Sequence, residues 1–175
     1  MKTLSTVLTA GILISSPVFA NQATNTESTH NHVFISTNMV HDSAKVMKMK
    51  LKDNIIGVAG GYEFALTPNL SVAPFAGIAI PHGDVKVGPA NVTVDHILQA
   101  GVTGTLRFDD QLFAFGRYEF NRAEASAMGQ TSEVDFNLYQ GGVGVNFTDN
   151  WGMDAFVGKG SHNKHAIGVD MTYRF

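Results

Sequence analysis

Apolar and polar residues alternate at period two through most of the chain after residue 30, and short turns interrupt the alternation. A period of two places successive side chains on opposite faces of a β-strand. No run after residue 20 approaches the roughly 18 apolar residues that a membrane-spanning helix needs. We therefore expect an all-β fold for this region.

The first twenty residues follow a different pattern, that of a secretory signal peptide. Lys2 supplies a positive start, residues 4–14 form an apolar stretch, and Val18-Phe19-Ala20 resembles a cleavage site. The stretch is too short and too rich in Ser and Thr for an uncleaved transmembrane helix. We expect residues 1–20 to be a cleaved signal peptide and residues 21–175 to form one domain.

Cleavage would remove Lys2 and no acidic residue, which takes the formal net charge from −3 to −4. An acidic balance of this kind excludes a general nucleic-acid binder. The chain contains no cysteine. An exported domain of this size without disulfides depends on its own hydrogen bonding and packing, or on a membrane.

Eight alternating segments are expected to be strands. They lie near 32–40, 55–66, 70–80, 94–108, 112–120, 133–147, 151–158 and 165–175. Three of the connections are short turns: Thr67-Pro68-Asn69, Asp109-Asp110-Gln111 and Thr148-Asp149-Asn150. The others are longer polar stretches, expected to be loops, at 41–54, 81–93, 121–132 and 159–164. Short turns that alternate with long loops are typical of an outer-membrane β-barrel, with the turns and both termini in the periplasm.

The two faces of the expected strands separate apolar from charged residues. When the apolar residues alone set the faces, Glu63, Arg107, Asp154, Asp170 and Arg174 fall on the opposite face. A charge facing lipid near the middle of the bilayer costs about 2–4 kcal/mol, whereas a water-soluble lipocalin-type barrel would show apolar residues inside and charges outside. The pattern therefore predicts an all-β, eight-stranded, antiparallel transmembrane up-and-down β-barrel.

Two strands leave the assignment of faces open. In the fifth strand, Phe113 and Phe115 compete with an apolar set on the other face, and only the charges Arg117 and Glu119 direct that other set toward lipid. In the sixth strand, Val134, Phe136 and Leu138 share one phase, but Val143, Val145 and Phe147 take the other. A β-bulge near Tyr139–Gly142 would reconcile the phases. Alternatively, the upper half of the strand projects beyond the bilayer.

The charges on the inward face nearly cancel, since four are acidic and three are basic. They are Glu63, Arg107, Arg117, Glu119, Asp154, Asp170 and Arg174. An eight-stranded barrel has an interior just wide enough for side chains. We therefore expect these residues to form a salt-bridge network that fills the lumen and leaves no large pore. An ion pathway is the alternative.

Three segments resemble a known group of proteins. The segments 61–70 and 144–152 (GYEFALTPNL and GVNFTDNWG) are similar to the strand–turn–strand units of the opacity, OmpA-membrane-domain and OmpX/Ail-like barrels. The last residues, GVDMTYRF, resemble the C-terminal signal that outer-membrane proteins present to the barrel-assembly machinery. The resemblance implies that Val169, Met171, Tyr173 and Phe175 carry this assembly signal. It implies the architecture rather than an activity, since a fold does not fix a function.

The first expected loop carries the basic residues Lys45, Lys48, Lys50 and Lys52, interleaved with Met47, Met49 and Leu51. The lysines are candidates for contact with lipopolysaccharide phosphates, because anionic lipid surrounds a barrel at that height. A solvated loop is the alternative, and the interleaved apolar residues are candidates for packing on the barrel mouth or touching a partner.

Two further candidate sites are weaker. His41, His82, His162 and His165 lie in or beside the expected outer loops, where imidazoles can bind zinc or copper, but their spacing fixes no geometry. Ser161-His162-Asn163 invites comparison with the lipid A deacylase barrels, yet their His-x-Ser-Asn pattern is absent. We therefore assign no catalytic, metal or cofactor residue and expect that the protein is not an enzyme.

The sequence thus predicts a monomeric barrel in the bacterial outer membrane, with a structural or adhesive role or a host ligand bound by its loops. Its expected partners are outer-membrane lipids, lipopolysaccharide and the barrel-assembly machinery, and no nucleic acid. The alternatives are a lipid-modifying enzyme and a narrow, low-conductance channel. No loop contains a motif that identifies a ligand.

Overall fold

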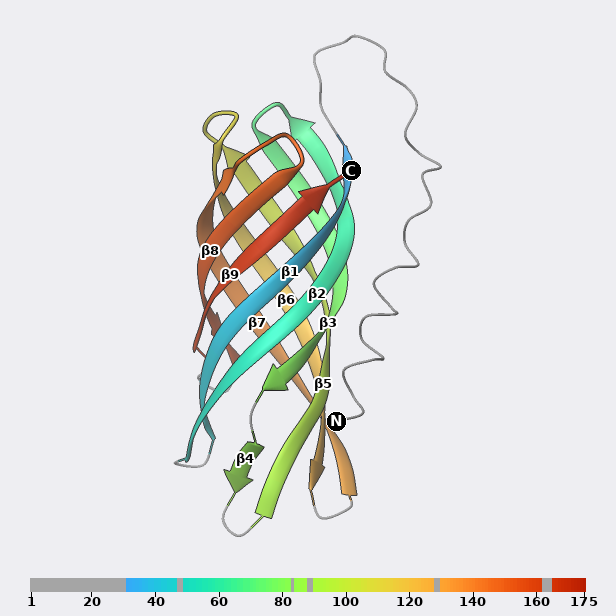
Figure 1. The fold of residues 1–175 in the computed structure, drawn as a ribbon, viewed down its shortest axis with the longest axis vertical. Coiled ribbons are helices and arrows are strands. Elements are labelled where there is room, and N and C mark those ends of the chain that lie inside the picture. The colour runs from blue at the N-terminus through green and yellow to red at the C-terminus, as the bar shows by residue number, and fades with distance from the viewer. Residues whose placement is uncertain (1–30, 47–48, 83, 88–89, 128–129, 162–164) are drawn as a thin grey trace.

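The computed structural model describes residues 31–46, 49–82, 84–87, 90–127, 130–161 and 165–175. Nine β-strands lie within these ranges (Figure 1): β1 (His32–Val46), β2 (Met49–Thr67), β3 (Leu70–His82), β4 (Asp84–Val87), β5 (Ala90–Arg107), β6 (Leu112–Ala127), β7 (Gln130–Asn146), β8 (Trp151–Gly160) and β9 (His165–Arg174). The described residues contain no helix that is long and apolar enough to cross a membrane.

The eight long strands form a closed antiparallel barrel. Each pairs with the next long strand along the chain, and β9 pairs with β1, from Phe34 opposite Arg174 to Ser43 opposite His165. The ninth strand, β4, pairs only with the start of β5, so that β3 pairs directly with β5 and completes the wall. The predicted all-β, eight-stranded, up-and-down barrel is confirmed.

A side chain at the start of each short turn shapes that turn. The Oγ1 atoms of Thr67 and Thr148 accept hydrogen bonds from the backbone N–H groups of Leu70 (3.0 Å) and Trp151 (3.0 Å). In the remaining turn, Asp109 Oδ1 accepts hydrogen bonds from the backbone N–H groups of Leu112 (2.6 Å) and Gln111 (2.8 Å). These bonds hold the pKa of Asp109 below its usual value. Ser, Thr and Asp favour turns for this reason. All three predicted turns lie at the end of the barrel that also holds the C-terminus (Figure 1), which we call the turn end.

The opposite, outer end differs from the expected long loops, because the strands continue into them. The β1–β2 ladder runs to the pair Val46–Met49, and the β6–β7 ladder runs to the pair Ala127–Gln130. Between them, β4 and β5 pair within the stretch expected to be a loop at 81–93. Ladder hydrogen bonds need no apolar face once the strands leave the bilayer, so a polar composition does not end a strand there.

The bulge proposed near Tyr139–Gly142 is not present. The register of β6 against β7 is continuous from Leu112–Val145 to Ala127–Gln130. Phe136 and Leu138 are buried in the lumen instead, while Tyr139 and Val143 are exposed on the outer surface. The predicted bulge is wrong because it rests on a lumen that is polar along the whole barrel. Phe136 and Leu138 face the lumen although they are apolar, so the strand has one phase throughout.

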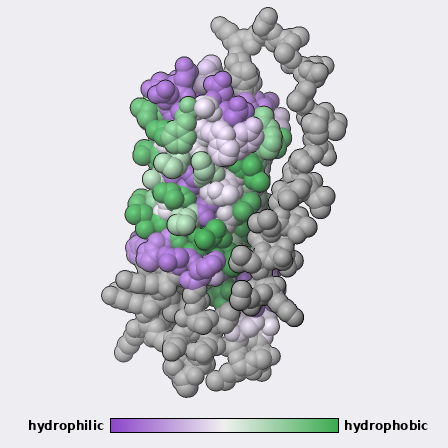
Figure 2. Space-filling view, in the orientation of Figure 1, coloured by the Kyte–Doolittle hydropathy of each residue, from purple (hydrophilic) through white to green (hydrophobic). Residues whose placement is uncertain are grey.

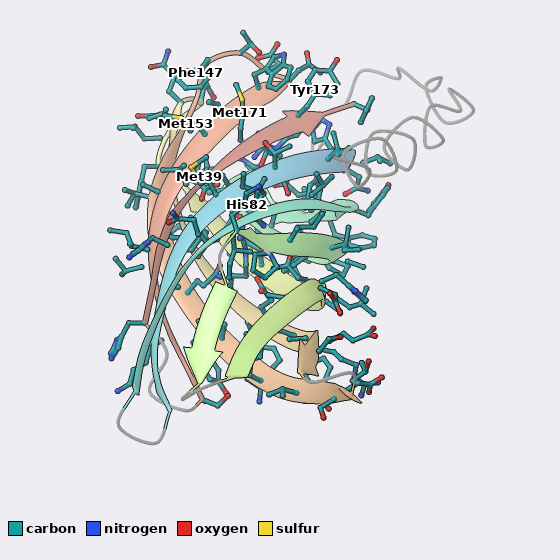
Figure 3. All side chains as sticks on the ribbon, turned by 60° about the horizontal axis from the view of Figure 1, so that its bottom comes forward. Met39, His82, Phe147, Met153, Met171 and Tyr173 are labelled. Atoms are coloured by element: carbon teal, nitrogen blue, oxygen red, sulfur yellow. The ribbon has the colours of Figure 1, made fainter. Side chains whose placement is uncertain are left out.

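An apolar belt surrounds the barrel. The large exposed apolar side chains on the lipid-facing phases of the strands include Ile56, Leu98, Val102, Leu106, Tyr118, Val157, Ile167 and Val169. Figure 2 shows hydrophobic residues between hydrophilic ends on one face, and Figure 3 shows Met39, Met153 and Met171 on the outer surface. Near the turn end, the Tyr173 ring lies 4.8 Å from each of the Trp151 and Phe175 rings. Aromatic girdles of this kind flank the lipid-facing band of membrane barrels.

Five inward phenylalanines lie directly opposite glycines on the adjacent strand. The pairs are Phe34–Gly61, Phe75–Gly101, Phe113–Gly144, Phe115–Gly142 and Phe156–Gly168. In each pair, a Cβ atom added to the glycine would lie under 3.0 Å from the ring. Each ring therefore covers the glycine backbone and occupies the space that a second side chain would need.

We expect Gly142→Ala to destabilise the barrel by about 1–3 kcal/mol, because the new methyl group would overlap the Phe115 ring and the Ala155 carbonyl oxygen. Gly116→Ala is the matched control: Gly116 is exposed on the adjacent strand and has no atom within 4 Å of an added Cβ. Urea unfolding in phospholipid vesicles measures both. Equal stability of the two variants would contradict the packing role of the ring.

Val102→Arg and Val169→Arg place a cation against lipid within the belt, since both side chains are more than 40% exposed on its surface. Each substitution should reduce the free energy of unfolding by about 2–4 kcal/mol in vesicles. Val102→Leu and Val169→Leu keep the surface apolar and should change it little. If the arginine variants are as stable as the leucine variants, the membrane assignment is wrong.

Candidate functional site

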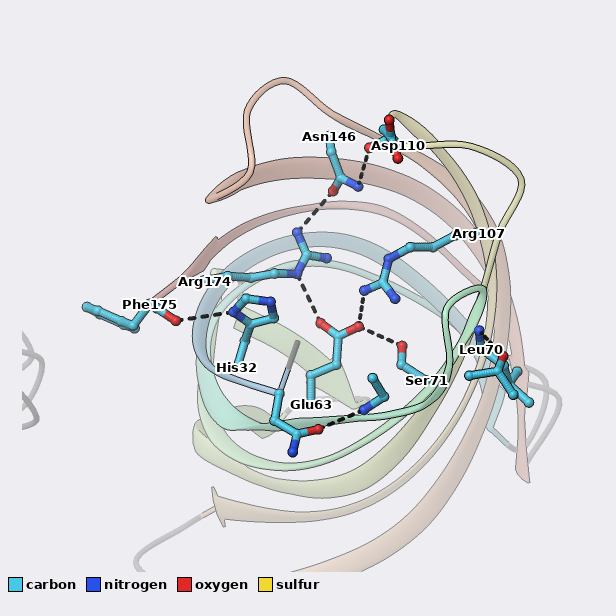
Figure 4. A network of polar contacts seen from close by, with 12 residues as sticks. His32, Glu63, Leu70, Ser71, Arg107, Asp110, Asn146, Arg174 and Phe175 are labelled. Carbon is cyan, nitrogen blue, oxygen red and sulfur yellow. Dashed lines mark hydrogen bonds and ion pairs between the residues drawn. The ribbon is translucent and has the colours of Figure 1, made fainter. Parts of the chain in front are cut away.

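A cluster around Glu63 joins five strands at the turn end of the lumen (Figure 4). Glu63 forms ion pairs with Arg107 and with Arg174, whose Nε lies 3.0 Å from Glu63 Oε2. Ser71 Oγ donates a 2.6 Å hydrogen bond to Glu63, and Arg174 Nη1 donates one of 3.0 Å to Asn146 Oδ1. The residues of this cluster come from strands β2, β3, β5, β7 and β9, so the cluster links these strands through the lumen.

Arg117 crosses the middle of the lumen. Its Nη1 lies 2.7 Å from Asp170 Oδ2 and 3.2 Å from Gln140 Oε1, and its Nε donates a 3.1 Å hydrogen bond to Thr103 Oγ1. Three phenylalanine rings surround the guanidinium carbon at 5.2–5.9 Å from their centroids: Phe75, Phe115 and Phe156. Cation–π contact adds to the charge-assisted hydrogen bonds at such distances.

The two remaining predicted lumen residues, Glu119 and Asp154, have no ion pair within 4 Å among the described residues. Glu119 accepts hydrogen bonds from Gln99 Nε2 (3.1 Å) and Gln140 Nε2 (3.5 Å). Asp154 lies directly opposite Asp170 in the β8–β9 register. All seven predicted residues thus lie in the lumen, and the structure joins five of them in two separate ionic clusters.

Side chains leave only small spaces in the lumen. The outer cavity, of about 20 Å³, is bordered by Asn38, Gln99, Glu119 and Phe136, and the turn-side cavity, of about 50 Å³, is bordered by Glu63, Asp154 and Arg174. Arg117 borders both cavities and separates them. A single water molecule needs about 10–15 Å³ by this kind of measure, so neither cavity is an open pore.

An apolar layer lines much of the outer cavity, which the sequence did not predict. Its members are buried side chains from strands around the wall: Val40, Ile55, Ala79, Ile97, Ala123, Phe136, Leu138 and Ala166. The signal was present in the sequence as consecutive apolar pairs, such as Ile55-Ile56 and Ile97-Leu98, in which one residue faces lipid and the other faces inward.

The predicted lipopolysaccharide contacts lie at the outer end. Lys45 pairs in register with Lys50, and Lys52 pairs with Ser43, so three of the four lysines belong to the extended β1–β2 ladder. Lys48 lies outside the described residues. The structure thus places Lys45, Lys50 and Lys52 on strand positions rather than in a loop.

The histidines do not converge in the described part of the chain. His41 Nδ1 lies 2.9 Å from Asn54 Oδ1, His82 and His165 are exposed at strand ends, and His162 lies outside the described residues. No three His, Asp or Glu side chains within the described ranges form a group suited to a metal ion. Ser161 Oγ accepts the Asn137 backbone N–H (3.2 Å), and Asn163 also lies outside the description.

Strand β9, which Phe175 follows directly, closes the barrel by pairing with β1. Val169, Met171 and Phe175 are exposed on its outer face, and Tyr173 is partly covered by neighbouring rings. The Phe175 N–H donates to the Val33 carbonyl oxygen (2.9 Å), and the Phe175 carbonyl oxygen lies 3.2 Å from His32 Nδ1. The assembly role of these residues stays a prediction.

No protein-family profile matches the chain, and no curated protein matches it. Among solved structures, Ail of Yersinia pestis is 14% identical, with a TM-score of 0.55, and the match covers 83% of this chain and 97% of Ail. Neisserial surface protein A is 16% identical, with a TM-score of 0.58 and coverages of 82% and 97%. The chain has the fold of the small eight-stranded outer-membrane barrels. A closed barrel of this fold with an apolar belt is a protein of the bacterial outer membrane.

Ail was also solved in complex with the heparin analogue sucrose octasulfate, and that structure matches with a TM-score of 0.57 and 15% identity over 83% of this chain and 99% of Ail. The N-terminal barrel domain of Pseudomonas aeruginosa OprF matches with a TM-score of 0.51 and 12% identity, over 83% of this chain and all of that domain. At these identities the matches establish the fold alone.

We expect the barrel, reconstituted in planar bilayers, to show no stable porin-like conductance, because Arg117 and its rings separate two small cavities. A sixteen-stranded porin measured in the same bilayers is the positive control. Steady, large single-channel steps from the purified barrel would overturn the closed lumen and favour the channel alternative.

Proposed function

We propose that this protein is a surface-binding outer-membrane barrel with a structural or adhesive role, and that its outer end binds polyanions. One observation carries the proposal: the wall continues beyond the belt as long paired strands, whereas the lumen is filled. A molecule built in this way presents an outer binding surface rather than a path through the membrane.

The basic residues of the β1–β2 ladder are the part of this surface that we assign to the polyanion. Lys45, Lys50 and Lys52 lie within 8 positions of one another on a two-stranded ladder, and Lys48 lies between the strands in the sequence. Lipopolysaccharide phosphates are the nearest anions at this height. The complex of Ail with sucrose octasulfate supports a sulfated host glycan as a further ligand of the same chemistry.

The proposal extends to the route by which the chain reaches the membrane. Residues 1–20 are proposed to direct export and to be removed, and Val169, Met171, Tyr173 and Phe175 to present the last strand to the barrel-assembly machinery. We propose a monomer that has no nucleic-acid partner and no enzyme activity. A lipid A deacylase-like activity has no support in the Ser161-His162-Asn163 order.

Replacement of Lys45, Lys48, Lys50 and Lys52 together by glutamine tests this assignment. Exposed charge pairs contribute about 0.2–1 kcal/mol each, so the combined variant should bind sucrose octasulfate about 4- to 800-fold more weakly. Titration of the barrel in nanodiscs measures the affinity, and wild-type binding should weaken as salt is raised. Lys159→Gln, on the exposed end of β8, is the control and should retain most of the affinity.

The same variants separate the two sources of anion. Stabilisation of the barrel by lipopolysaccharide, relative to phospholipid alone, should fall with the combined substitution if the lysines contact lipid phosphates. Loss of sulfated-glycan binding with unchanged lipopolysaccharide stabilisation would assign the lysines to a host ligand only. Unchanged behaviour in both measurements would contradict the assignment of the binding surface.

A further inference from the structure

The charges of the lumen balance at the turn end and in the middle. Glu63 and Asp154 oppose the two cations Arg107 and Arg174, and three of these residues border the turn-side cavity. Arg117 is paired with Asp170 at 2.7 Å. With Glu119 at the outer cavity included, four acidic and three basic residues face the lumen, so one negative charge is left over.

Glu119 is the carboxylate of this set that has no ion pair within 4 Å among the described residues and borders the outer cavity. Its side chain is 3% exposed and interacts with the amides of Gln99, Gln140 and Asn121. The charge of Arg117, already paired with Asp170, acts on it from farther away. A buried carboxylate without a cation is costly, because neutral donors compensate only part of its lost hydration. A counter-ion near Glu119 would remove this cost.

The outer cavity beside Glu119 carries the oxygen atoms that such an ion needs. Asn38 and Gln99 border this cavity, both are more than 90% buried, and Asn38 Oδ1 and Gln99 Oε1 accept no hydrogen bond from the described residues. Gln99 already uses its Nε2 to donate to Glu119, which leaves its oxygen available. The side chains of one carboxylate and two amides therefore border one small cavity.

We propose that the outer cavity is a binding site for one monovalent alkali cation, represented by Na⁺, held by the Glu119 carboxylate and the amide oxygens of Asn38 and Gln99. The donor set contains oxygen only, which suits hard cations. The cavity volume of about 20 Å³ accommodates one ion with little water.

A monovalent ion fits this site better than a divalent one for two reasons. One positive charge neutralises the single excess charge, whereas two would leave the lumen positive beside Arg117, which borders the same cavity. Mg²⁺ also retains several of its waters, for which the cavity has no room. A water molecule alone would satisfy the amide oxygens but leave the charge of Glu119 unopposed.

Refolding into neutral phospholipid vesicles tests the site. The wild-type barrel is refolded and unfolded in urea with either NaCl or N-methyl-D-glucamine chloride at equal ionic strength, since the organic cation is too large for the cavity. A ligand that binds only the folded state multiplies the folding equilibrium constant by 1 + [Na⁺]/Kd. Above the dissociation constant, each tenfold increase in Na⁺ should therefore increase this constant about tenfold.

Glu119→Gln should abolish the difference in stability between the two salts, because it removes the negative charge and keeps the size and planar shape of the side-chain end. Glu124→Gln is the matched control, since Glu124 lies on the outer surface opposite His96 and should leave the Na⁺ effect intact. If Glu119→Gln does not fold, anomalous diffraction from wild-type crystals grown with Tl⁺ replaces this comparison. The proposal requires an anomalous peak within reach of Glu119, Asn38 and Gln99.

Three results would overturn the proposal: wild-type stability that is equal in the two salts, a Na⁺ effect that persists in Glu119→Gln, or a Tl⁺ peak absent from the cavity. Equal stability of the wild type and Glu119→Gln, together with no Na⁺ effect, would show instead that a proton neutralises Glu119. These outcomes do not depend on the lysines of the proposed outer binding surface.

Discussion

The hydrogen bonding of the backbone in lipid determines the rest of this structure. No water is present in the bilayer core to satisfy N–H and C=O groups, so a sheet that crosses it must close on itself. The pairing of β9 with β1 and of β3 with β5 achieves this closure. Closure then fixes which residues face lipid and which face inward, because side chains alternate along every strand. The short strand β4 pairs on one side only, and it lies at the outer end, beyond that requirement.

Closure of eight strands leaves an interior narrow enough to be filled, and the chain fills it in three ways. Phenylalanines cover glycines of the adjacent strands, arginines form ion pairs across the lumen, and an apolar layer packs around the outer cavity. Three of the four arginines are inside, and no lysine is among the lumen residues described. The planar guanidinium bonds several acceptors while its face packs on rings, as Arg117 does, which the compact lysine ammonium cannot do.

Alternation and turn chemistry were enough to predict the barrel, its turns and the inward direction of five of the seven charges, because these features depend on local sequence and on the cost of charge in lipid. In the fifth strand the apolar residues left the faces open, and only Arg117 and Glu119 themselves indicated which face is inward. The partners of those charges were not predictable. Glu63 contacts Arg174 from the other end of the chain, and only the shear of the closed barrel sets that distance. The face on which Phe136 and Leu138 lie was not predictable for a related reason. An apolar residue does not indicate whether it faces lipid or an apolar layer of the lumen. The strands of the outer hairpins are longer than the sequence predicts, because strand pairing continues without an apolar face.

The filled lumen also limits where function can reside. Transport needs a continuous path, and Arg117 with its three rings interrupts any path between the two cavities. Catalysis needs a nucleophile, a base and an orienting group in reach of one another. Among the described residues Ser161 Oγ accepts the Asn137 backbone N–H, and its sequence neighbours His162 and Asn163 lie outside the description. The outer end carries the β1–β2 and β6–β7 ladder extensions, which lie beyond the part of the wall that must close within lipid. Differences in function between barrels of this fold are therefore expected to reside in the strand extensions, while the lumen maintains the shape that presents them.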